Sequence, residues 1–148
     1  MVGAAASGPS GDQRLLALAT ASVGHATVIR SGADSLDPAD LNLALRYLPD
    51  LRCAVLVRPP ARLLPTALAD ADWAGATLVL VGPLEADAVA ALDDAPGSAP
   101  IVLEPPADAD PDDTFAGFVA ALATRLDAGD PPETAFRATV AALAADPA

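Results

Sequence analysis

The chain has 148 residues, a formal net charge of −12 and 37 alanines, which suits one domain with its own hydrophobic core. Eight arginines, no lysine and 20 acidic residues leave little cationic surface for a phosphate backbone, so the composition argues against nucleic-acid binding. Neither a basic leader nor an apolar run of membrane-spanning length occurs in the sequence, which predicts a cytoplasmic protein with no membrane contact.

The first 30 residues are predicted to form a tail followed by a hairpin. Residues 1–12 are rich in Gly, Ser and Ala and are expected to form a disordered tail, followed by a single domain over residues 13–146. The apolar runs Leu15–Ala21 and Ala26–Arg30 are predicted to form an antiparallel hairpin, because a short polar segment containing His25 separates them. His25 itself is interpreted as a loop residue.

The next element is predicted to be a helix from its start signals. Asp37 is a typical N-cap and Pro38 suits the first helical position. An apolar face then follows at helical spacing, formed by Leu41, Ala44, Leu45 and Leu48.

Two continuous apolar runs, Cys53–Val57 and Thr77–Val81, predict strands covered on both faces. The helical stretch between them, residues 60–74, must begin or kink at Pro65. Strand, helix and strand in this order predict a parallel pair. The only cysteine, Cys53, has no partner for an internal disulfide, and we expect it to pack as a small apolar residue.

The C-terminal part is predicted to be mainly helical. After a short helix over residues 84–92 and a strand at Ile101–Leu103, helices are expected over residues 114–126 and 133–145. Phe136, Val140 and Leu143 are predicted to face inward from the last helix. These elements predict a small three-layer α/β domain whose sheet is mostly parallel, with the antiparallel hairpin at one side.

Two segments carry a family resemblance. Asp113-Thr114-Phe115-Ala116-Gly117-Phe118 opens a helix, and the alanine-rich residues 135–143 form a second one. Upstream, Ser31-Gly32-Ala33-Asp34 precedes the helix that begins after Asp37. This pattern resembles the ribokinase-like, or phosphofructokinase B, carbohydrate kinases, in which a Gly-Ala-Gly-Asp-Thr-Phe motif opens a helix. The chain has about half the usual length of that family, and the sugar-binding N-terminal region with its Gly-Gly motif is not matched.

The resemblance implies a catalytic base and a changed phosphate site. Asp113 matches the family's base, whereas Asp110, Pro111 and Asp112 stand where the family has Gly-Ala-Gly. Pro111 lacks an N–H donor, and two carboxylates replace glycines that cradle phosphate. A pair of like charges 4 Å apart costs roughly 1 kcal/mol in water and about 4 kcal/mol at an effective dielectric of 20. The attraction of a helix N-terminus for an anion is only roughly 0.3–1 kcal/mol. The repulsion by the two carboxylates is larger, so the resemblance implies that this chain has lost the family's phosphate site.

Further ligand-binding residues are suggested by the same resemblance and by position. Gly32 and Asp34 lie in the upstream segment that resembles the family, and Arg58 falls where the family has an acidic residue that contacts the sugar. The family's Asn-x-x-Glu motif matches residues 84–87 without its asparagine. Arg58 and Arg62 also form a close basic pair after a predicted strand, where α/β sheets bind ligands.

Other interpretations of the acidic segment stay open. Asp113 is either a general base or a helix cap. Asp108, Asp110 and Asp112 resemble the start of a calcium loop, but the turn glycine is missing and Val119 stands in place of the bidentate glutamate, so no metal site is predicted.

Two functions follow as hypotheses. The chain is either an ATP- and Mg²⁺-dependent sugar kinase that needs a partner to supply the missing half, or a non-catalytic domain that binds a sugar, a nucleotide or another protein. In both cases we expect a homodimer, or a partner chain that covers the exposed edge of the sheet.

Overall fold

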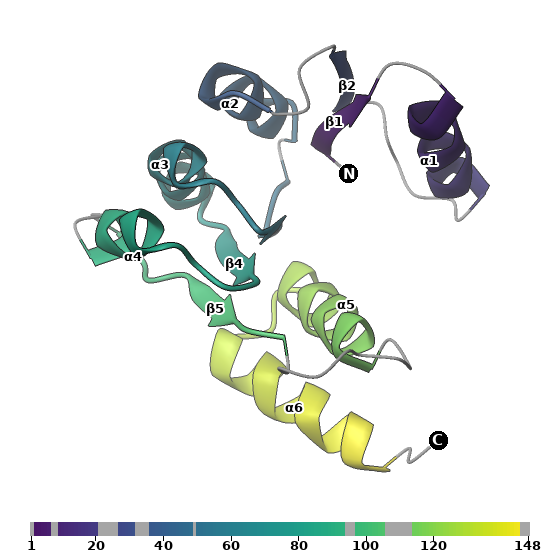
Figure 1. Cartoon of the computed structure of the whole chain (residues 1–148). Helices are drawn as coiled ribbons and strands as arrows, with labels where there is room; N and C mark the ends of the chain where they lie inside the picture. The colour runs from purple at the N-terminus through teal and green to yellow at the C-terminus, as the bar shows by residue number, and fades with distance from the viewer. Residues whose placement is uncertain are drawn as a thin grey trace. The chain divides into compact units, whose positions relative to one another are not determined.

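A computed structural model describes residues 2–6, 9–20, 27–31, 36–48, 50–93, 97–105 and 114–145 (Figure 1). The chain divides into two compact units, residues 1–48 and 49–148. The single domain over residues 13–146 stays a prediction. No Gly- or Ser-rich linker marks this boundary, which falls at Leu48-Pro49 in the sequence, and composition therefore did not reveal it.

The first unit contains a parallel strand pair and two helices. The elements are β1 (Val2–Ala6), α1 (Pro9–Thr20), β2 (Thr27–Ser31) and α2 (Pro38–Arg46). In the parallel register of β1 and β2, Val2 lies opposite Thr27 and Ala6 opposite Ser31. The chain passes through α1 between the two strands, as a parallel pair requires a long connection.

This unit differs from the sequence prediction in two ways. Residues predicted as a disordered tail form β1 and the beginning of α1, and the predicted antiparallel hairpin is wrong because its first arm lies in α1. Glycine and alanine are depleted in strands, so Val2–Ala6 gives almost no strand signal. Alanine and leucine are strong helix formers and Pro9 occupies the first helical position, so local propensity favours the helix.

The predicted start of α2 is confirmed. The Asp40 backbone N–H donates to the Asp37 carboxylate at 2.8 Å, and Pro38 occupies the first turn. The cap satisfies a backbone donor that has no partner within the helix. Leu41, Ala44 and Leu45 are buried, as the helical spacing predicts, whereas Leu48 lies beyond the end of α2 and is 39% exposed.

The second unit is built on a parallel sheet. Its elements are β3 (Cys53–Val57), η1 (Ala61–Leu63), α3 (Leu64–Ala74), β4 (Thr77–Val81), α4 (Ala86–Asp93), β5 (Ile101–Leu103), α5 (Thr114–Asp127) and α6 (Pro132–Ala145). The strand order is β3-β4-β5, with Cys53 opposite Thr77 and Val79 opposite Ile101. The bounds of the three strands and the mixed α/β class are confirmed, and Pro65 lies in the first turn of α3. Coverage on both faces holds for β4 but not for β3, which is only partly buried and whose Val57 is 68% exposed.

The central strand β4 is covered on both faces. Val79 and Val81 belong to a core cluster with Leu122, Leu126 and Ala135 of the C-terminal helices. Leu78 and Leu80 point to the opposite face, because side chains alternate along a strand, and both are buried on the side where α3 contacts β4. Figure 1 shows α3 and α4 on one side of these strands and α5 on the other.

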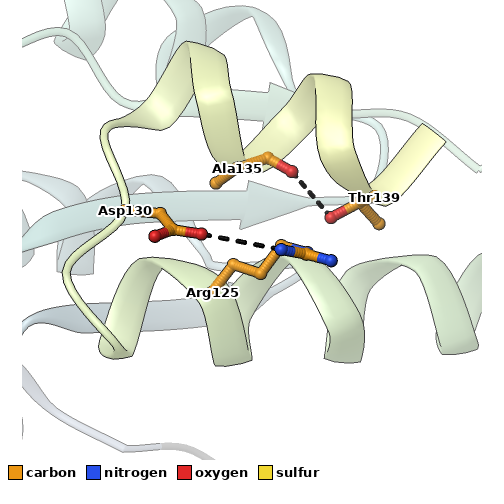
Figure 2. Close-up of polar contacts among 4 residues, drawn as sticks. All are labelled: Arg125, Asp130, Ala135 and Thr139. Carbon is orange, nitrogen blue, oxygen red and sulfur yellow. Dashed lines mark hydrogen bonds and ion pairs between the residues drawn. The ribbon is translucent and has the colours of Figure 1, made fainter. Parts of the chain in front are cut away.

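Helix α6 contacts α5 through small residues. Ala135 and Thr139 are 0% and 1% exposed, and the Thr139 hydroxyl donates to the Ala135 carbonyl at 2.8 Å (Figure 2). This internal hydrogen bond lets a polar side chain be buried without an unpaired group. The turn between the helices is spanned by an ion pair of Arg125 with Asp130 at 3.6 Å.

The inward face predicted for α6 is wrong. Phe136, Val140 and Leu143 are 43%, 46% and 39% exposed, and the neighbouring small residues face the core instead. Small side chains allow the two helix backbones to approach closely, and Phe136 packs on Phe118 of α5 while keeping 43% of its surface exposed. The spacing of the apolar residues correctly predicts a helix here, but the side of that helix that is buried is the one that carries Ala135 and Thr139.

We expect Ala135→Leu to destabilise the protein because Ala135 has no exposed surface and the added carbons must push α6 from α5. Overpacking of this kind costs about 1–3 kcal/mol. Ala141→Leu on the exposed side of the same helix is the control and should change stability by less than about 0.5 kcal/mol. Urea unfolding followed by circular dichroism measures both, and equal midpoints for the two variants would contradict the packing described.

Candidate functional site

The carboxyl ends of the parallel strands form the candidate site. Strand β3 ends before Arg58, β4 before Gly82 and β5 before Glu104, and parallel strands present these residues at one edge of the sheet. In α/β sheets ligands bind at this edge because the connecting loops there are free to carry functional groups.

Arg58 has an unusual backbone. Its φ is 48°, in the left-handed region, and it is the one non-glycine residue with positive φ in the part of the chain that the structure describes. The Arg58 N–H donates to the Val81 carbonyl at 2.7 Å, which ties the turn after β3 to the end of β4. Non-glycine residues in this region cost of order 1 kcal/mol or more and are frequent at functional sites. The strain marks Arg58 as a residue held in place by its surroundings.

Gly82 supports the Arg58 side chain. Gly82 has φ of 118°, and its N–H donates to the Leu103 carbonyl at 2.9 Å. A Cβ at this position would lie 2.9 Å from Arg58 Cγ, so the aliphatic stem of Arg58 rests against the bare glycine. The contact requires both the unusual φ and the missing side chain. Gly82 therefore leaves room for the stem of Arg58, a residue that is itself exposed.

The rest of this edge carries charges of both signs. Arg62, in η1, is exposed, and so are Glu85 before α4 and Glu104 after β5. Guanidinium groups bind carboxylate and phosphate oxygens in a planar, bidentate way. Residues 58–60, 82–85 and 104–105 contain no hydroxyl, thiol or imidazole group. These loop residues can therefore hold an anion, but they contain no Ser, Thr, Cys or His to act as a nucleophile.

The structure describes only two of the residues predicted to form the site. Arg58 and Arg62 lie at the candidate edge, within one stretch of chain after β3. The remaining candidates fall outside the described residues: Gly32, Asp34, Asp110, Pro111, Asp112, Asp113 and also His25. Helix α5 begins at Thr114, the residue after Asp113 in sequence. Residues 84–87 lead into α4, where the Asp87 carboxylate accepts from the Ala88 N–H at 2.9 Å.

Cys53 lies at the amino end of β3 and packs against the core, as predicted. Burial raises the pKa of the Cys53 thiol from 9.0 to about 11, and the nearby negative charge of Asp127 adds to the rise. Because the thiolate is the reactive form, Cys53 is a poor nucleophile at neutral pH. It does not belong to the candidate site, which is at the other end of the strand.

A small hollow of about 230 Å³ lies at the amino edge of β4 and β5. Asp72, Thr77 and Ser98 contribute its polar groups, and a Cβ on Gly97 would lie 2.9 Å from the Asp72 carboxylate. The sequence did not predict this hollow. It did not predict the contact between Gly82 and Arg58 either, for which the only signal is a glycine directly after a predicted strand. Neither feature adds a reactive group to the carboxyl edge.

Comparison with known proteins finds no family model, curated protein or solved structure that matches the chain. The residues themselves must therefore carry any functional argument. Among the described helices, none is both long and apolar enough to span a membrane.

We expect Gly82→Ala to destabilise the fold, because the new Cβ requires an unfavourable φ and collides with Arg58 Cγ. A loss of about 1–3 kcal/mol in the free energy of unfolding is expected. The double variant Gly82→Ala with Arg58→Ala should recover part of the loss, since only the collision is removed. Gly75→Ala, at φ of 66° with no atom near the new Cβ, is the matched control for backbone strain. Additive effects of the two site substitutions would contradict the contact.

Proposed function

We propose that this chain is a reduced ribokinase-like domain that does not phosphorylate sugars on its own and that binds a small anionic ligand, or a partner protein, through the retained fold. The observation that carries the proposal is the sequence before α5, where Asp110-Pro111-Asp112 stands in place of the Gly-Ala-Gly of the kinases it resembles. The parallel order β3-β4-β5, followed by α5 and α6, is compatible with that resemblance.

The residues before α5 do not fit the phosphates of a nucleotide. A phosphate cradle at a helix N-terminus needs backbone N–H donors and closely approaching glycines. Pro111 has no N–H, and the side chains of Asp110 and Asp112 bring negative charge to a site for an anion. Because these residues lack the N–H donors that phosphate needs, the isolated chain is not expected to transfer a phosphoryl group.

The carboxyl edge supports an anionic ligand over a sugar hydroxyl. The family residue that contacts the sugar is acidic, whereas this chain has Arg58 at the matching position. The structure gives Arg58 a left-handed backbone and a glycine support, and the residue is exposed. A carboxylate or phosphate ester of a small molecule suits this group.

A second candidate function is sugar phosphorylation with a partner or a second copy that supplies the phosphate cradle. One observation favours it: Asp113, which matches the family's catalytic base, is retained directly before α5. In that case ATP and Mg²⁺ would be required, and the partner would have to provide the phosphate cradle. Cytoplasmic location stays a prediction under both functions.

Replacing Asp110 and Asp112 by Gly and Pro111 by Ala tests the proposal. The triple variant should regain N–H donors and lose two like charges, so weak ADP binding should appear where the wild type shows none. Isothermal titration calorimetry measures binding, and circular dichroism establishes that the variant is folded. Asp108→Gly is the control, because it adds a glycine and removes a charge outside the matched motif. Equal binding by wild type and variant, or none by a folded variant, would contradict the proposed alignment.

A further inference from the structure

The hollow at the amino edge of β4 and β5 contains a carboxylate that has no counter-charge. Among the described residues that line the hollow, Asp72 is the one with a charged side chain, and Thr77 and Ser98 add hydroxyl groups. No hydrogen bond or ion pair joins these three side chains to another residue in the described part of the chain. All three are therefore available to a ligand.

The backbone around the hollow offers few donors to an anion. Gly75, Ala76 and Thr77 line it, and their N–H groups already donate to backbone carbonyls at 3.1, 2.8 and 2.8 Å. Pro132, the first residue of α6, also lines the hollow and has no N–H. A ligand that enters the hollow therefore meets acceptors in the main, which favours a ligand that carries hydrogen-bond donors.

Asp72 lies where a negative charge is stabilised by a cation. It is in the last turn of α3, which contains no basic residue, so its carboxylate is near the negative end of the helix dipole. Gly97, at φ of 111°, leaves the space for this carboxylate, because a Cβ there would lie 2.9 Å from Asp72 Oδ1. The glycine thus accommodates a carboxylate at a position that is unfavourable for it until a cation binds.

We propose that the hollow binds the primary ammonium group of a small organic amine, with the Asp72 carboxylate and the hydroxyls of Thr77 and Ser98 as acceptors. An ammonium group has three N–H donors, one for each of these side chains. The apolar lining residues, Leu78 and Ile101 among them, suit the alkyl part of the ligand. The inference does not rest on the proposed function, because the hollow lies at the opposite end of the strands from the carboxyl edge.

The size of the hollow limits the ligand to a few carbon atoms. Its volume is about 230 Å³, whereas an apolar cavity of about 150 Å³ holds one benzene molecule and pockets for drug-sized ligands begin at about 300 Å³. Butylammonium fits this range and is charged at neutral pH, as a lysine amine is. A ligand with so few atoms binds weakly, and we expect a dissociation constant of about 1–10 mM.

An NMR titration of the isotope-labelled full chain with butylammonium, at constant ionic strength, tests the site. The amide signals of Thr77 and Ser98 should shift and saturate in that concentration range. Butanol has the same size without the charge and should bind at least tenfold more weakly. Asp72→Asn keeps the side-chain shape and should weaken butylammonium binding at least tenfold. Asp93→Asn, exposed at the end of α4 and outside the hollow, removes the same net charge and should change the dissociation constant less than twofold.

A blocked lysine, N-acetyl-lysine N-methylamide, identifies the source of the ammonium group. The same group is carried by a free small amine and by a lysine side chain of a partner protein. Weaker binding of the blocked lysine than of butylammonium would support the free amine that we propose. Tighter binding of the blocked lysine would overturn that choice in favour of a protein side chain.

Three further results would overturn the inference. No shift at Thr77 and Ser98 at concentrations tenfold above the expected range would mean that the hollow does not bind amines. Equal binding of butanol and butylammonium would mean that the hollow takes only the alkyl chain. Equal binding by Asp72→Asn and the wild type would place the ammonium elsewhere on the acidic surface. The comparison of the two ligands uses the wild type alone, so it holds even if Asp72→Asn does not fold.

Discussion

The second unit depends on the double burial of β4. Leu78 and Leu80 are buried on one face, Val79 and Val81 on the other, and neighbouring strands pair with both edges of β4. Burying one such side chain stabilises a fold by about 1.5–3 kcal/mol, so this strand is a large share of the stability of a small core. Because its two neighbours run parallel to it, three strands end at the same edge. That edge is where Arg58 and Gly82 meet.

The main functional group at the carboxyl edge of the sheet is the Arg58 guanidinium. Arg58 is held by a strained backbone, by its N–H bond to Val81 and by contact with Gly82, and the described loop residues beside it add the carboxylates of Glu85 and Glu104. A guanidinium in this position suits recognition of a carboxylate or a phosphate. The proposal of a reduced, non-catalytic ribokinase-like domain joins this geometry to the sequence before α5, where Pro111 and two aspartates replace glycines.

Sequence patterns predicted the elements whose signals are local and strong. The β-branched runs gave β3 and β4 with correct bounds, and Asp37 with Pro38 located the start of α2. Strand β1 was missed because its alanines favour no strand, and pairing with β2 overrides that weak preference. The buried face of α6 was missed because close helix packing selects Ala135 and Thr139 over larger residues. Arg58 was found from its position, whereas its φ and its contact with Gly82 exist only in three dimensions.

A coupled phosphotransfer assay on the purified full chain tests the central claim most directly. ATP and Mg²⁺ are supplied with ribose, fructose 6-phosphate or a nucleoside, and ADP release is followed for the wild type and for Asp113→Ala. The account predicts that neither protein turns over any substrate above the rate without enzyme, because Asp110, Pro111 and Asp112 stand where the kinases that the sequence resembles have the glycines that cradle phosphate. Turnover by the wild type that disappears in Asp113→Ala would contradict it.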